Sequence, residues 1–172
     1  MGRKGSPLQK LLAVSALAMA LSLGLPAAVS ASSPQQVTFG QTVTSDVFVS
    51  ARPAGASGNT RFVDVATGEF TGAVVGAFTE TDYFLLHADG TGNFHGVDTC
   101  TCTIDGRSGI LVIRYTGTMA ADGTFVSPFV ILRGDGGLAG IKGEGVSTGV
   151  YIGVTPYSFT NILQYQFTSG GR

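Results

Sequence analysis

The sequence predicts an all-β domain with antiparallel strands, and three observations lead to this prediction. Short runs rich in Val, Ile, Thr, Phe and Tyr recur along the chain, with turn signals between them. No run shows a convincing helical period. Parallel sheets need helices to cover their faces, so strands without helices imply antiparallel pairing. A sandwich and a closed barrel both satisfy this pattern.

Residues 1–31 have the features of a signal peptide. Three basic residues precede an apolar run over residues 11–25. Pro26 ends the run, and Val29-Ser30-Ala31 offers the small residues of a cleavage site, so we expect cleavage after Ala31. An uncleaved anchor is the alternative, but the run is short for a spanning helix, which takes about 20 residues. We therefore expect a secreted or periplasmic protein with no membrane span in its mature part.

The part of the chain after Ala31 is long enough for one domain with a sizeable core. It holds 7 of the 10 basic residues, because Arg3, Lys4 and Lys10 precede it, and all 11 acidic ones, so its formal net charge is 7 − 11 = −4. It has no basic run, which argues against nucleic acid as a partner. An outer-membrane barrel is a further alternative, although Trp is absent and the chain ends Thr168-Ser169-Gly170-Gly171-Arg172 rather than on an aromatic residue.

Ten runs qualify as strands, and Gly, Pro and Asp separate most of them. They are Gln36–Val43, Asp46–Ala51, Thr60–Ala66, Phe70–Thr79, Asp82–Ala88, Gly92–Ile104, Arg107–Gly117, Gly123–Leu132, Ile141–Val150 and Tyr157–Phe167.

Two turn signals are especially clear. Asp105-Gly106 stands between two long runs, which is the signature of a type I′ hairpin. The glycine-rich stretch from Gly134 to Gly145 makes a poor helix, and we expect a tight corner there.

Strand alternation assigns side chains to the two faces of each strand. In Gly92–Ile104 the threonine side is typical of solvent, so Asp98, Cys100 and Cys102 point inward with Phe94. In the last run Tyr157, Phe159, Asn161, Leu163, Tyr165 and Phe167 share the inner face, and in Arg107–Gly117 the residues Leu111, Ile113 and Tyr115 do so.

Cys100 and Cys102 lie on one face of one strand, about 7 Å apart along an extended chain. A bridge between them needs a local kink, because the Cβ atoms of a disulfide lie roughly 3.8 Å apart. A strained disulfide, a soft-metal site and two small buried apolar side chains are the three interpretations. The only histidines are His87 and His95, and His95 falls on the opposite face, so we expect no metal site.

Asp98 is the strongest candidate for a chemical role. A carboxyl group inside an apolar barrel has a raised pKa and needs a partner. It can act as a general acid or base, anchor a polar group of a ligand, or simply pair with Arg114 or Arg107 near the barrel mouth. Glu80 and Asp82 flank Thr81, and paired carboxyl groups can do acid–base work or bind calcium. Calcium takes six to eight oxygen ligands and no ligand loop with EF-hand spacing is present, so we interpret the pair as a solvated turn between strands.

The chain resembles an uncharacterised bacterial family with an allene-oxide-cyclase-like barrel. The resemblance rests on Asp105-Gly106-Arg107-Ser108-Gly109, on a strand ending in Thr116-Gly117-Thr118 and on the stretch Gly134–Gly145, and it covers roughly residues 59–167. It implies a single closed antiparallel barrel of about eight strands, in a superfamily shared with allene oxide cyclases and dirigent proteins. Members often carry a Gln-His pair where this chain has Arg114 and Tyr115. Within that barrel domain, residues 32–58 supply N-terminal strands and a loop, residues 59–168 the remainder, and residues 169–172 a flexible tail.

Three function classes follow from a barrel with such a lumen. The first is a binding protein for a small apolar ligand, held by Phe94, Leu111, Ile113, Arg114, Phe159, Asn161 and Tyr165. The second is a cofactor-independent cyclase or isomerase acting on a flexible apolar substrate, with Asp98 and Tyr115 as catalytic residues. The third is a structural envelope protein whose lumen is a filled core. No cofactor is expected, and the sequence leaves the ligand, the reaction and the oligomeric state open.

Overall fold

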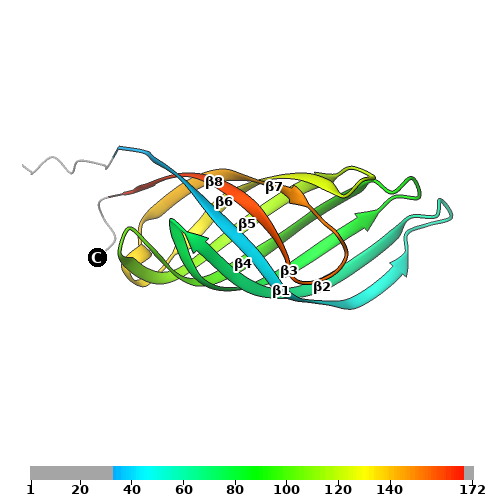
Figure 1. Ribbon diagram of the computed structural model, residues 1–172, viewed down its shortest axis with the longest axis horizontal. Coiled ribbons are helices and arrows are strands. Elements are labelled where there is room, and N and C mark those ends of the chain that lie inside the picture. The colour runs from blue at the N-terminus through cyan, green and yellow to red at the C-terminus, as the bar shows by residue number, and fades with distance from the viewer. Residues whose placement is uncertain (1–32, 169–172) are drawn as a thin grey trace, which may run out of the picture.

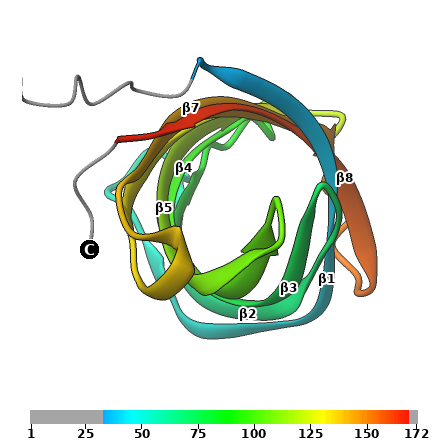
Figure 2. The same cartoon turned by 90° about the vertical axis from the view of Figure 1, so that its left-hand side faces the viewer.

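A computed structural model describes residues 33–168; the expected signal peptide and its cleavage site, and the expected tail, lie outside the described residues. Eight strands form one closed antiparallel barrel in which each strand pairs with the next and the last pairs with the first. Seen end-on, the strands make a continuous ring (Figure 2). The strands are β1 (Gln35–Pro53), β2 (Thr60–Gly72), β3 (Val74–Leu86), β4 (Gly92–Ile104), β5 (Arg107–Met119), β6 (Thr124–Gly134), β7 (Ile141–Val150) and β8 (Tyr157–Phe167), with a single 3₁₀ turn η1 (Gly136–Leu138) between β6 and β7.

The expected closed antiparallel barrel of about eight strands is confirmed. The division of the chain into ten runs was wrong, for two reasons. Gln36–Val43 and Asp46–Ala51 belong to one long strand, β1, whose register against β2 shifts between Val43 and Ser45. Such an irregularity bends a strand without ending it. The turn between β2 and β3 lies at Ala73, inside the predicted run Phe70–Thr79.

The expectation of a solvated turn at Glu80-Thr81-Asp82 was also wrong. They lie in the interior of β3, where Glu80 is the register partner of Asp98 and Asp82 is the partner of Asp64. A polar triplet imitates a turn in the sequence, but alternation sends Thr81 outward and both carboxyl groups into the barrel.

Both turn signals were read correctly. Asp105 and Gly106 have φ angles of +51° and +71°, as a type I′ hairpin between β4 and β5 requires. The glycine-rich stretch forms the corner with η1, and Leu138 on this turn is fully buried at the end of the barrel. The same stretch also supplies Gly143 and Gly145 to the interior of β7.

Inward aromatic rings lie opposite glycines on the neighbouring strand. A Cβ atom on any of these glycines would collide with its partner's side chain, so the missing side chain makes the room that the ring occupies. Eight strands enclose only a narrow interior, and this pairing lets several rings fit within it. The register pairs of this kind are Phe78–Gly68, Phe94–Gly117, Tyr115–Gly96, Phe129–Gly145 and Tyr165–Gly143.

The two ends of the barrel differ. The end that carries the β4–β5 hairpin and η1 is filled by buried apolar side chains, among them Val74, Ile104, Leu111, Leu138 and Leu163. The loops β1–β2, β3–β4 and β5–β6 lie at the other end (Figure 1). Because the first of these ends is filled, any site inside the barrel belongs to the other, second end.

Among residues 33–168, no helix is long and apolar enough to cross a membrane.

Candidate functional site

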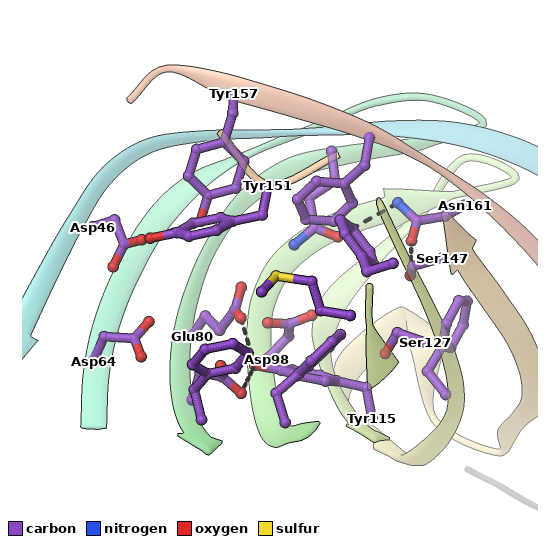
Figure 3. A pocket seen from close by; sticks show the side chains of 18 of the residues that line it. Asp46, Asp64, Glu80, Asp98, Tyr115, Ser127, Ser147, Tyr151, Tyr157 and Asn161 are labelled. Atoms are coloured by element: carbon purple, nitrogen blue, oxygen red, sulfur yellow. Dashed lines mark hydrogen bonds between the residues drawn. The ribbon is translucent and has the colours of Figure 1, made fainter. Parts of the chain in front are cut away.

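A cavity of about 270 Å³ occupies the barrel interior at the second end. Typical ligand pockets measure roughly 300–1,000 Å³, so this cavity suits a small molecule. Rings and aliphatic chains form most of its wall, and polar groups interrupt the wall on two sides (Figure 3). Its lining consists of Phe39, Gln41, Asp46, Phe48, Phe62, Asp64, Phe70, Glu80, Asp82, Phe84, Leu86, Phe94, Asp98, Ile113, Tyr115, Met119, Phe125, Ser127, Phe129, Ser147, Tyr151, Tyr157, Phe159 and Asn161.

Five carboxyl groups line this cavity, from four consecutive strands. Asp46 comes from β1, Asp64 from β2, Glu80 and Asp82 from β3, and Asp98 from β4. Glu80 and Asp98 stand directly opposite each other in the register, and so do Asp64 and Asp82. Like charges directly opposite across two strands are destabilising. Among residues 33–168, no Lys, Arg or His lines the cavity to offset them.

Tyr115 ties two of these carboxyl groups together. Gly96, its partner on β4, leaves room for the ring, and the hydroxyl group reaches past β4 to β3. There it donates to Glu80 Oε1, and it lies 3.0 Å from Asp82 Oδ1. A hydroxyl group carries one proton, so it can donate to only one of the two carboxyl groups at a time.

Asp98 is the most deeply buried of the five, with only 5% of its surface exposed. Its Oδ1 atom has no hydrogen-bond partner within the described part of the chain. Buried polar atoms without partners are uncommon in folded proteins, and each one calls for an explanation.

Burial dominates the electrostatics of the cluster. Burial, and then the charges of Glu80 and Asp64, raise the pKa of Asp82 to about 8. Burial, and then the charges of Asp46 and Glu80, raise the pKa of Asp64 to about 7. Burial also raises the pKa of Glu80 and, with the neighbouring charge of Glu80, that of Asp98. Perturbed carboxyl groups of this kind gather at functional sites more often than elsewhere.

A second polar group faces the carboxyl groups from the other side of the cavity. Ser147 on β7 donates to Asn161 Oδ1 on β8, and Asn161 Nδ2 donates to Gln41 Oε1 on β1 over 3.4 Å. Ser127 on β6 donates to the backbone of Thr116 over 3.2 Å. The side chains of this group all have hydrogen-bond partners, whereas Oδ1 of Asp46 and Oδ1 of Asp98 have none among residues 33–168.

The wall of the barrel changes where β1 leaves β8. The two strands pair only from Gln35 to Val43 of β1, and the rest of β1 pairs with β2. Beside this part of β1, Tyr157 donates to Asp46 Oδ2 over 3.2 Å, and the rings of Tyr151 and Tyr157 meet edge to face at 5.4 Å (Figure 3). The two tyrosines and Asp46 thus border the cavity where the strand pairing ends.

The structure brings six of the nine predicted site residues to the cavity. Asp98 and Tyr115, the candidate catalytic residues, lie together there, and Phe94, Ile113, Phe159 and Asn161 line the wall as well. Any catalytic or binding role for these six stays a prediction.

The other three do not line it. Arg114 is exposed on the outer face of β5, because alternation that turns Ile113 and Tyr115 inward turns Arg114 outward. Leu111 and Tyr165 face inward but belong to the filled end of the barrel.

Both cysteines are free and buried, as the interpretation of two small apolar side chains expects. They belong to the filled core and are not part of the cavity lining. Among residues 33–168, no group of three or more His, Cys, Asp and Glu side chains is arranged to hold a metal ion.

Sequence reasoning missed four of the five carboxyl groups. Asp46 and Asp64 received no role, and Glu80 and Asp82 were assigned to a turn. A signal did exist, because Asp64 alternates with Phe62 and Ala66, and Asp82 alternates with Phe78 and Phe84. Continuing the inward pattern through β2 and β3 would have placed three of them inside the barrel.

The fold and the cavity define a class: a small eight-stranded β-barrel with an acidic and aromatic site in one end of its lumen. A family model described as "Protein of unknown function (DUF3224)" matches residues 43–160, and the chain belongs to this family. A crystal structure of a DUF3224 protein of unknown function from Shewanella oneidensis MR-1 is similar, with a TM-score of 0.64 and 17% identity over 78% of this chain and 98% of that one. No curated protein matches the chain.

Proposed function

We propose that this protein binds a small, largely apolar molecule in the lumen of its barrel. One observation carries the proposal: one end of the barrel is filled by core side chains, while the other end holds a cavity of about 270 Å³ walled by aromatic rings. Phe94, Phe125 and Phe159 pack edge to face along this wall, with ring centroids 5.8 and 5.2 Å apart. Apolar cavities with a few placed polar groups are the usual form of a small-molecule site. The cavity argues against a lumen filled throughout as a structural core.

Native mass spectrometry of the purified protein tests the proposal directly, because a ligand that co-purifies adds its mass to the chain. A titration with 2-phenylethanol, followed by amide chemical shifts, provides a second test. We expect the shifts to cluster at Phe94, Phe125 and Phe159. Ser127→Phe places a ring in the cavity wall and should abolish this binding, whereas Thr118→Phe on the exposed face of β5 should preserve it. Equal binding by both variants would contradict a lumen site.

A second candidate function is that of a cyclase or isomerase without a cofactor. The pair Glu80–Asp98 favours it, since two opposed carboxyl groups in an apolar cavity can hold and pass on one proton. Tyr115 would then orient the pair through its bond to Glu80. The test is to incubate a recovered ligand with the wild type and with Asp98→Asn. Conversion to an isomer of equal mass by the wild type alone would support catalysis.

We also propose that the barrel acts after export from the cytoplasm. Residues 1–31 support this through their basic start, apolar run and small-residue cleavage site. N-terminal sequencing of the mature protein should begin at Ser32 or within a few residues of it. Recovery of a mature chain that retains Met1 would contradict export with cleavage.

A further inference from the structure

The carboxyl groups of the cavity lack hydrogen-bond donors. Glu80, Asp82 and Asp98 together present six carboxyl oxygens, each able to accept more than one hydrogen bond. Their donors in the structure are the hydroxyl group of Tyr115, which Glu80 and Asp82 share, and the backbone N–H of Tyr83, which bonds Asp82. Glu80 and Asp98 also hydrogen-bond each other, which requires that one of the two carboxyl groups carries a proton. Oδ1 of Asp98 has no donor within residues 33–168, although it is buried at the wall of the cavity. The site is thus short of N–H or O–H groups at Oδ1 of Asp98, and Oδ1 of Asp46 on the same lining also has no partner among residues 33–168.

The same place is also short of positive charge. Five carboxyl groups surround the cavity, and two pairs of them stand directly opposite each other in the register. The described basic residues nearest in sequence, such as Arg61 and Arg114, are exposed on the outer faces of their strands. Opposed carboxyl groups that cost stability, with no basic side chain on the lining of the cavity to pair with them, are typical of a binding site rather than of a scaffold.

The remaining wall suits the apolar part of a cationic molecule. The rings of Phe84, Phe94, Phe125 and Phe159 follow one another around the cavity with centroids 5.2 to 6.2 Å apart. Aromatic faces attract cations, and their edges and bodies pack against hydrocarbon. The carboxyl groups and the rings together therefore favour a ligand that carries a positive charge on an apolar body.

We infer that the ligand of this lumen is a small organic cation, a protonated amine on an apolar body, whose N–H groups lie between Glu80, Asp82 and Asp98. The inference rests on the proposed lumen binding and adds the chemical class of the ligand. An ammonium group brings three donors and a positive charge, which supplies both of the missing features. Asp98 Oδ1 is the acceptor that such a group would satisfy first.

Binding of a cation should depend on pH, because the cation favours the charged form of each carboxyl group. The titratable groups that face Asp98 and Glu80 are all acidic or phenolic: Asp46 from β1, Asp64 from β2, Asp82 from β3, Tyr115 from β5, Tyr157 from β8, and Tyr151 from the β7–β8 loop. Since burial raises the pKa values of Asp64 and Asp82 to about 7 and about 8, the empty site holds protons near neutral pH. A bound amine would release part of these protons, so affinity should rise as the pH rises.

The experiment compares three probes of similar size: 2-phenylethylamine, a cation; 2-phenylethanol, its neutral analogue; and phenylacetate, an anion. Calorimetry and amide chemical shifts measure each affinity at about pH 5.5 and about pH 8.5, a range in which the amine stays charged. We expect the amine to bind roughly tenfold or more tightly than the alcohol at the higher pH, as charged hydrogen bonds in a dry site imply. The difference in affinity between the amine and the alcohol should shrink at the lower pH. Binding of the amine should release protons into the buffer.

Two variants locate the effect. Asp98→Asn and Glu80→Gln should each remove most of the preference for the amine while the alcohol still binds, and Glu69→Gln on the exposed face of β2 is the matched control. Binding of the alcohol or of phenylacetate as tight as that of the amine would overturn the inference and leave lumen binding intact. Failure of all three probes to bind would overturn both proposals. Binding of Ca²⁺ from millimolar CaCl₂ at these carboxyl groups, with no preference for the amine over the alcohol, would identify a metal site instead and would also overturn the inference.

Discussion

Tyr115 lies over Gly96, its register partner on the neighbouring strand, and the absent side chain of Gly96 is what lets the tyrosine hydroxyl group reach Glu80 and Asp82 on β3. The backbone of one strand thus sets the hydrogen bonding of two carboxyl groups on another.

Gly96→Ala should displace the ring of Tyr115 and weaken its contact with both carboxyl groups. The added methyl group would collide with the tyrosine hydroxyl and with the Thr81 carbonyl oxygen. Overpacking of this kind costs about 1–3 kcal/mol, measurable as the free energy of unfolding in urea. Gly40→Ala is the control, because there the methyl group meets only the end of the Thr71 side chain. In a Tyr115→Leu background the cost of Gly96→Ala should shrink; an unchanged cost would contradict the role of the ring.

Tyr115→Phe should destabilise the protein more at high pH than at low pH. The variant keeps the ring but leaves Glu80 and Asp82 without the hydroxyl donor. An unsatisfied buried acceptor costs about 1–3 kcal/mol, and more when it is charged, so the loss grows as the carboxyl groups ionise. Urea unfolding at about pH 5 and about pH 8 measures this difference. Tyr83→Phe is the control, because this side chain lies on the outer face of β3 and is 48% exposed. Its free energy of unfolding should match that of the wild type at both pH values.

The stability of the folded barrel should fall as the pH rises toward 8. Asp82 has a pKa of about 8 in the folded protein against an ordinary value of 3.8. Between these values the folded state keeps a proton that the unfolded state has released, so a rise in pH favours unfolding, by up to about 1.4 kcal/mol per pH unit for one group. Above pH 8 the contribution of Asp82 levels off. Asp82→Asn should flatten the decline, whereas Asp122→Asn, in an exposed turn, should leave it in place. A wild-type stability that rises from pH 5 to pH 8 would refute this account.

Cys100 and Cys102 should resist thiol reagents in the native protein. Their side chains are 0% and 3% exposed, and both are free. We expect slow labelling of the folded protein and two reactive thiols after denaturation. Fast native labelling would contradict their inward orientation, and two unreactive sulfur atoms after denaturation would indicate a disulfide.

The amino-acid sequence determined the local features of this protein. Alternation along β4, β5 and β8 was sufficient to place Asp98, Tyr115 and Phe159 inside, because side chains on a strand point to opposite faces in turn. Asp105-Gly106 determined its hairpin, since the required φ angles are intrinsic to those residues.

Only the tertiary structure decided which of these residues meet. Register pairs Glu80 with Asp98 and Asp64 with Asp82, and closure of the barrel places a pair of tyrosines beside Asp46. It also decided that Leu111 and Tyr165 fill the core while Ile113 and Asn161 line the cavity. Depth within a barrel depends on strand tilt and on the packing of opposite walls, and neither quantity is local to any one strand.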